Sequence, residues 1–196
     1  EYEEPETLIQ KSLKVDPLTS SYLFEGDGIE LEVSFTTPLL LDDLDLLTRP
    51  ASYVTFSVRS IDGKSHDVKI YFDVSGELCV NTSDQKIVWS RKMINDNIVA
   101  MRMGTEEQPI LKRIGDDTRI DWGYCYLAAP QTTYLKTVIQ SYNGRKQFVE
   151  SGQLLMEDDQ QQPRQVIVDT PVMAAVLDIG EVQECQSSHY LLLAYD

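Results

Sequence analysis

The sequence predicts an all-β fold, a two-layer antiparallel β-sandwich with about ten to twelve strands and at most one short helix. Apolar and polar residues alternate with a period of two in several segments, as in residues 29–35, which is typical of a strand with one buried face. Turn-forming pairs such as Asp62-Gly63 and Ser75-Gly76 separate these segments. So many strands exceed what one flat sheet usually holds, so we expect two packed layers.

The first part of the chain contributes a strand at Leu8–Val15, ended near Pro17, and another at 29–35. Residues 53–81 are expected to form a three-stranded antiparallel meander, because glycine-containing turns connect its alternating segments. Its strands are 54–58, 68–74 and 78–80. Further strands are expected at 86–89, 97–103, 119–127, 166–169, 172–179 and 189–195.

A helix is indicated only at 143–151, where Gly152 stands at a position favoured by helix C-termini. Residues 131–141 fit either a strand or a loop, and 157–162 before Pro163 form a polar connection. No internal repeat or linker interrupts the chain. We therefore expect residues 1–196 to form a single β-sandwich domain, and the abrupt start to reflect a fragment of a longer chain.

The chain is acidic, with 32 acidic and 17 basic residues and a net charge of −15. Nucleic-acid binding depends on Lys and Arg that neutralise phosphates, so we expect no nucleic-acid partner. Anionic membrane surfaces are disfavoured for the same reason. No apolar run approaches the roughly 20 residues that a membrane helix needs.

Residues suited to metal or nucleophilic chemistry are sparse. The three cysteines, Cys79, Cys125 and Cys185, are widely spaced and fit buried free thiols better than a disulfide framework or a metal site. His66 and His189 lack the closely spaced further ligands of a zinc site. We expect no metal, no cofactor and no catalytic residue in this chain.

Carboxylates cluster at Asp42-Asp43-Asp45, Asp116-Asp117 and Glu157-Asp158-Asp159. In so acidic a chain these clusters are expected to be solvated turns. The alternative is a self-contained hydrolase, which needs two carboxylates that converge in a pocket with perturbed pKa values. Sequence alone does not give their separation.

Aromatic residues gather around residues 119–127. Trp122, Tyr124 and Tyr126 would share one face of a strand, with Trp89 nearby. The rings are expected to fill the core, because one strand face must be buried. The alternative is a carbohydrate-binding module that stacks a glycan on Trp89, Trp122 and Tyr124.

Leucines crowd the segment from Leu39 to Pro50. Six of them are too many to point to one side of a strand, so we expect an apolar surface that contacts a neighbouring domain. The alternative is a strand buried on both faces. The residues expected at the contact are Leu39, Leu41, Leu44 and Leu47.

An ordered set of sequence strings resembles the N-terminal domain of the glutaminase A-type family of secreted bacterial and fungal proteins. Each string is only moderately specific, but the ordered set spans nearly the whole chain. The strings are Leu39–Pro50, Tyr53–Phe56, Asp62–Val68, Tyr71–Asp73, Asp121–Tyr124, Arg145 with Gln147-Phe148, Gly152, and Leu192–Asp196.

The resemblance implies a β-sandwich followed by a helical-toroid domain that carries the catalysis. It implies secretion or a periplasmic location, and hydrolysis of glutamine to glutamate and ammonia by fungal members. The partner would then be the C-terminal catalytic domain of the same polypeptide. No catalytic motif of the family falls on a position of this chain, which favours a non-catalytic accessory domain.

Overall fold

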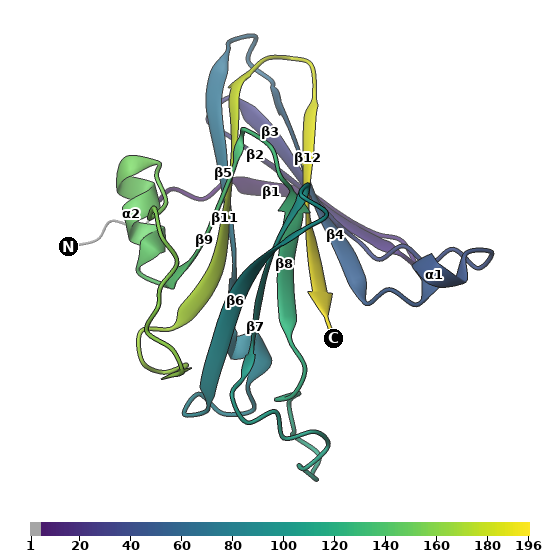
Figure 1. Ribbon diagram of the computed structural model, residues 1–196. Helices are drawn as coiled ribbons and strands as arrows, with labels where there is room; N and C mark the ends of the chain where they lie inside the picture. Colours follow the sequence, from purple (N-terminus) through teal and green to yellow (C-terminus); the bar gives the residue numbers. More distant parts are fainter. Residues whose placement is uncertain (1–4) are drawn as a thin grey trace. The chain divides into compact units, whose positions relative to one another are not determined.

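The computed structural model describes residues 5–196 and confirms an all-β sandwich. Half of the chain is strand, and the twelve strands found in these residues belong to two antiparallel sheets (Figure 1). The chain forms two compact units. Unit 1 comprises the residues up to Ile70 together with Leu177–Ala194, and unit 2 comprises Tyr71–Val176 with Tyr195–Asp196.

Unit 1 is built on a run of strands in the order β1-β2-β3-β4-β12. Its elements are β1 (Ile9–Val15), β2 (Thr19–Gly26), β3 (Ile29–Thr36), the short helix α1 (Leu44–Leu47), β4 (Ala51–Ser60), β12 (Ser187–Tyr195), and parts of β5 (His66–Ser75) and β11 (Pro171–Val182). The two faces of this sheet differ in chemistry. The polar face carries hydroxyl pairs such as Ser21–Ser34, whose Oγ atoms are 2.8 Å apart.

The opposite face of this sheet supplies the core of unit 1. Register places Leu31 beside Val58, and Val58 packs with Val68 of β5 and Val182 of β11. Alternation explains the pattern, because Val54, Phe56 and Val58 are buried while the residues between them are more exposed. Removal of this apolar surface from water is the main stabilising contribution.

Unit 2 contains a run of strands in the order β8-β7-β6-β10 and a second sheet in the order β5-β11-β9. Its elements are the 3-10 helix η1 (Gly76–Cys79), β6 (Lys86–Ile94), β7 (Ile98–Thr105), β8 (Cys125–Pro130), β9 (Leu135–Ser141), α2 (Gly144–Ser151), β10 (Arg164–Gln165), and the remaining parts of β5 and β11.

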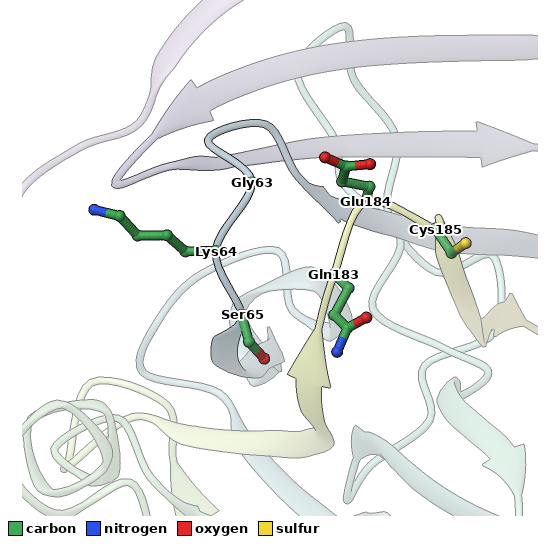
Figure 2. A pocket seen from close by; sticks show the side chains of 6 residues that line it. All are labelled: Gly63, Lys64, Ser65, Gln183, Glu184 and Cys185. Atoms are coloured by element: carbon green, nitrogen blue, oxygen red, sulfur yellow. The ribbon is translucent and has the colours of Figure 1, made fainter.

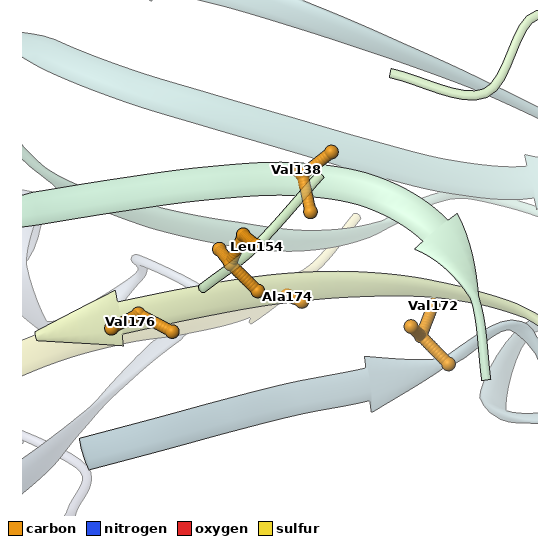
Figure 3. Packing of buried hydrophobic residues seen from close by; sticks show 5 residues of the cluster. All are labelled: Val138, Leu154, Val172, Ala174 and Val176. Carbon is orange, nitrogen blue, oxygen red and sulfur yellow. The ribbon is translucent and has the colours of Figure 1, made fainter. Parts of the chain in front are cut away.

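A cluster of small and branched residues forms one part of the core of unit 2 (Figure 3). Val172, Ala174 and Val176 project from β11, Val138 comes from β9, and Leu154 follows α2. Tyr71 and Phe148 pack against this cluster, with ring centroids 5.0 Å apart. These contacts hold α2 against the sheet.

The predicted meander over residues 53–81 is wrong. β4 and β5 belong to different sheets, so their connection crosses between layers instead of closing a hairpin. The connecting residues bond elsewhere, because Ser60 N–H donates to Gln183 and Ile61 N–H donates to Gly28. Residues 76–79 form the 3-10 helix η1, begun by the Ser75 hydroxyl, which accepts from Glu77 N–H.

Other segments differ from the prediction in extent. Strand β2 was not predicted, and 166–169 is a turn region that follows the two-residue strand β10. The strand expected at 119–127 begins only at Cys125. Helix α2 confirms the predicted helix, with Gly152 at its C-cap in the left-handed conformation. None of the helices in residues 5–196 is long and apolar enough to cross a membrane.

Candidate functional site

The leucine-rich segment, residues 39–47, lies between β3 and β4 and extends from the sheet of unit 1 into solvent (Figure 1). A hydrogen bond of 2.7 Å between the Thr37 and Ser52 hydroxyls closes its base. Within it, the Asp43 carboxylate caps α1 by accepting from Leu46 N–H at 2.9 Å. The cap and the polar base order the segment although α1 buries none of its residues.

Most leucines of this segment are exposed to solvent and do not pack in the core. Leu41 is 83% exposed, Leu44 is 71% exposed and Leu39 is 40% exposed, whereas Leu47 is half-buried. The alternative of a strand buried on both faces is therefore wrong. Contiguous exposed apolar residues of this kind are typical of a surface that contacts another protein or domain. We call Leu39–Leu47 the leucine segment.

The sheet beside this segment is also incompletely covered. No residue of β1, β2 or β3 is fully buried, although their apolar face carries aromatic rings. Tyr22 meets Phe35 edge to face, with centroids 6.1 Å apart, and Phe35 remains 41% exposed. Leu13 and Val15 of β1 are 50% and 69% exposed. Unit 1 thus presents more unpartnered apolar surface than the leucine segment alone.

The aromatic platform predicted from Trp89, Trp122 and Tyr124 is not assembled. Trp89 is a core residue, only 5% exposed, and its indole N–H donates to the Asp159 carbonyl at 2.7 Å. Trp122 precedes β8 and is half-buried. Trp89 therefore offers no ring face to a sugar.

Tyr124 lies on the outer face of its sheet, so its predicted place in the core is wrong. Its ring covers Gly104 so closely that a Cβ at position 104 would come within 2.6 Å of it. The Arg102 guanidinium stacks on the same ring, 4.4 Å from its centroid. Both contacts occupy surface that a stacked sugar would need.

In the acidic cluster at 157–159, Asp158 serves local structure. Asp158 accepts two hydrogen bonds from Arg91, at 2.8 and 2.7 Å, and a third from Ile139 N–H. Burial opposes ionisation of Asp158, but these donors together lower its pKa. A general acid needs the opposite shift. The Asp116-Asp117 pair is exposed in a loop.

Asp121 anchors a polar network that sequence reasoning had not assigned. It is 2% exposed and bonds to Arg113 Nε at 2.5 Å and to Gln85 Nε2 at 2.9 Å. Burial works against its charge, yet Arg113 and Gln85 lower the pKa of Asp121. Gln85 and Arg113 also line an open polar hollow of about 370 Å³.

The residues after Asp121 contact the C-terminal end of β12. Two strings that are far apart in the sequence, Asp121–Tyr124 and Leu192–Asp196, therefore meet in the fold. Gly123 adopts φ 78°, and a Cβ there would meet the Asp196 carbonyl oxygen at 2.6 Å. Tyr124 and Asp196 exchange backbone hydrogen bonds of 2.6 and 3.0 Å, and the Tyr195 hydroxyl donates to the Trp122 carbonyl. The string Asp121–Tyr124 therefore holds the end of β12 in unit 2.

A second pair of strings meets at an ion pair whose carboxylate is buried. Asp73 of β5, whose side chain is 4% exposed, accepts two hydrogen bonds from Arg145 of α2. The Tyr71 hydroxyl donates to the same carboxylate at 2.7 Å, and burial followed by this bond raises the pKa of Tyr71. Arg145 also stacks on the Tyr142 ring. This network fixes α2 to the sheet.

Neither histidine belongs to a metal centre in the described part of the chain. His66 Nε2 lies 2.9 Å from Asp62, and this bond, followed by one from Lys64 N–H, lowers the pKa of Asp62 to about 2. His189 is half-buried beside Ser187. Among residues 5–196, no group of three or more His, Cys, Asp or Glu side chains is arranged to hold a metal ion.

An open hollow of about 390 Å³ lies beside the turn that contains Asp62. It is lined by residues of two loops of unit 1, namely 63–65 and 183–185 (Figure 2). Lys64 extends away from the other labelled side chains, so the polar groups do not converge on one point. The geometry of this hollow therefore indicates neither a catalytic nor a binding site.

A family model described as a domain of unknown function, DUF5127, matches residues 18–196. The match covers most of the chain. The chain belongs to this family. The strings that tie together β5, α2, residues 121–124 and the end of β12 all fall within the matched region of this DUF5127 chain.

Glutaminase A of Aspergillus oryzae is 27% identical to this DUF5127 chain over 184 residues. The alignment covers 90% of this chain and 26% of the fungal protein, so the chain spans about a quarter of the length of this relative. The resemblance to the glutaminase A-type family, predicted from the strings, is confirmed.

Two solved structures align with most of the chain. Heparan sulfate lyase HepC from Pedobacter heparinus has a TM-score of 0.45 and 5% identity, covering 96% of this chain and 21% of its own. A putative kojibiose phosphorylase from the human microbiome has a TM-score of 0.40 and 12% identity, covering 91% of this chain and 17% of its own. Similarity this low assigns no role to the chain.

Proposed function

We propose that this chain is a non-catalytic accessory sandwich of a longer, glutaminase-like amidohydrolase. In this proposal the leucine segment packs against the domain that performs the catalysis, a helical toroid that follows in the same polypeptide. Support comes from the similarity to Glutaminase A, of which the chain spans about a quarter. A secreted or periplasmic location accompanies this proposal.

The observation that carries the proposal is the exposure of the leucine segment. Leu41 and Leu44 have large apolar side chains, yet more than two thirds of each is exposed. Burying such a side chain against a partner contributes about 1.5–3 kcal/mol. The Thr37–Ser52 bond and the Asp43 cap hold the segment in place before any partner arrives, which lowers the entropic cost of association.

The carboxylates support an accessory role in a different way. The carboxylates with the most hydrogen-bond partners are paired with arginines in structural contacts. They are Asp73, Asp121 and Asp158. Asp121 and Asp158 have lowered pKa values, which suits structural ion pairs better than proton donation. We therefore place the chemistry of the longer protein in its other domain.

The test is the double substitution Leu41→Ser with Leu44→Ser, made both in this chain and in the longer protein. In this chain the free energy of unfolding should change by less than about 0.5 kcal/mol, because both side chains are already exposed. In the longer protein it should fall by roughly 2–4 kcal/mol, because the docked surface is lost. Chemical denaturation measures both.

Leu78→Ser provides the control, since Leu78 is 58% exposed on η1, which belongs to unit 2. It should leave both proteins unchanged. A double variant that destabilises this chain by itself would show that the leucines belong to its own core. Equal stability of the wild-type and double-variant longer proteins would overturn the docking proposal.

A further inference from the structure

The outer face of unit 2 carries a groove of about 400 Å³ across β6, β7 and β8. Alternation directs Ser90 and Lys92 of β6, Arg102 of β7 and Tyr126 of β8 to this face. Register places Ser90 beside Arg102 and Arg102 beside Tyr126. Ala100 forms a low floor between them. Arg91 and Ile94 of β6 also line the groove, which therefore combines polar, aromatic and aliphatic side chains across three strands.

Arg102 is oriented within the groove by the protein itself. Its Nε donates to the Ser90 hydroxyl at 2.9 Å, and its guanidinium stacks on Tyr124. Tyr124 is in turn seated on Gly104, where no larger residue would fit. The terminal nitrogens of Arg102 make no hydrogen bond with residues 5–196. A planar, pre-oriented fork of this kind suits a carboxylate.

The charge of the groove is opposite to that of the chain. The chain has a net charge of −15, yet Lys92 and Arg102 have no ion pair with any residue in 5–196. Arg91 also lines the groove, but its charge is compensated because it is bound to Asp158. No carboxylate lines the groove. Two uncompensated cations on an acidic protein define a local site for an anion.

The aromatic and small residues indicate what kind of anion fits. Tyr126 is half-buried and lines the groove. An aromatic surface packs against the C–H face of a sugar ring, while hydroxyl and amino groups bond to sugar hydroxyls. The groove volume lies in the range of small-ligand sites.

The groove lies on the face of the sheet and not along a strand edge. Strand β7 has a neighbour on both sides, and β6 pairs with β7 over Ile87–Ile94 but with β10 only at Lys86 and Ile87. A peptide that adds a strand to a sheet pairs with such an edge and does not need the side chains of the face. Nucleic acids are disfavoured because, within residues 5–196, the groove offers only two uncompensated cations, Lys92 and Arg102, for a long series of phosphates.

We propose that this groove binds an oligosaccharide that carries carboxylate groups, such as a chain of uronic acid residues. Arg102 binds one carboxylate, Lys92 binds a second carboxylate or ring hydroxyls, and Tyr126 packs against a sugar face. This site differs from the Trp89, Trp122 and Tyr124 platform predicted from sequence. It is also independent of the leucine segment, which lies in unit 1.

The experiment is isothermal titration calorimetry of this chain with a galacturonic acid trimer, and with a galactose trimer as its neutral counterpart. The acidic trimer should bind at least about tenfold more tightly than the neutral one, and its affinity should fall as salt is raised. Arg102→Gln and Lys92→Gln should each weaken binding about tenfold. Lys136→Gln, which removes an exposed charge outside the groove, should leave binding unchanged.

Thermal melting of each variant separates a lost contact from a lost fold, and the variants should melt like the wild-type chain. Absence of binding by the acidic trimer would overturn the proposal. Equal binding of the two trimers, or binding that survives both groove substitutions, would do the same. Tighter binding of a glutamate-rich peptide than of the acidic trimer would assign the groove to a protein partner instead.

Discussion

Asp121 illustrates how a single carboxylate is kept ionised inside unit 2. Burial alone would raise its pKa, but Arg113 and Gln85 lower it. The Thr105 hydroxyl donates to the Asp121 carbonyl at 2.5 Å, so the backbone is bound as well as the side chain. Residues 121–124 are thereby placed to hold the end of β12.

Replacing Asp121 with Asn should lower the free energy of unfolding by about 1–3 kcal/mol, because Arg113 loses a charged partner. The loss stays moderate because 40% of the Arg113 side chain is exposed and still reaches water. Urea denaturation at neutral pH measures the effect. Asp116→Asn, in an exposed loop, is the matched control and should be neutral. Equal stability of all three proteins would show that the network contributes nothing.

The same carboxylate gives a pH signature. A folded-state pKa below the unfolded value of roughly 3.9 adds stability above that value, and this stability is lost as the pH falls through the folded pKa. The stability difference between wild type and Asp121→Asn should therefore shrink as the pH drops below about 4. A difference that stays constant into strong acid would contradict the lowered pKa.

Residue-level prediction from sequence succeeded where alternation alone decided burial. Val54, Phe56 and Val58 are buried as their pattern predicts. The prediction that Trp122 and Tyr124 fill the core failed, because Trp122 lies before the strand and Tyr124 points outward. A ring stacked between glycine and arginine cannot be distinguished by spacing from a ring in the core.

At the level of elements, α2 was the easiest to predict because its end is specified locally. Gly152 has φ 65°, and its N–H donates to the Phe148 carbonyl. This left-handed conformation costs a residue with a Cβ roughly 1–2 kcal/mol. The helix boundary therefore follows from one residue, without knowledge of the rest of the fold.

Gly152→Ala should destabilise the chain by about 1 kcal/mol, since alanine pays this conformational cost but also restricts the unfolded chain. Gly152→Asn should cost less, because asparagine tolerates the left-handed conformation. Thermal unfolding of the two variants gives the comparison. If alanine proved as stable as glycine, the C-cap assignment would be contradicted.

Pairing between elements was harder to predict because it depends on distant residues. The turn Asp62-Gly63 is compatible with a hairpin, yet the Ser60 amide bonds to Gln183, far along the chain. The leucine segment shows the same limitation. Its composition predicted an apolar surface, but only the structure shows that the leucines are exposed and that Asp43 caps a helix there.

At the scale of the whole molecule, residues 5–196 include two exposed surfaces of different chemistry to which we assign a partner or ligand. The leucine segment of unit 1 is apolar, and the groove on β6–β8 of unit 2 is basic. The sequence predicted the first surface from its leucines and missed the second, because Lys92, Arg102 and Tyr126 meet only through strand register. Both surfaces lie within residues 18–196, which the family model matches.

The most direct measurement is glutamine hydrolysis by this chain and by the longer protein, at equal molar concentration and under the same conditions. We expect ammonia release by the longer protein and none above background by this chain, because we propose that the chemistry belongs to another domain. Hydrolysis by this chain alone would contradict the accessory role and make its carboxylates the first residues to substitute. Inactivity of both proteins would contradict the assignment to a glutaminase.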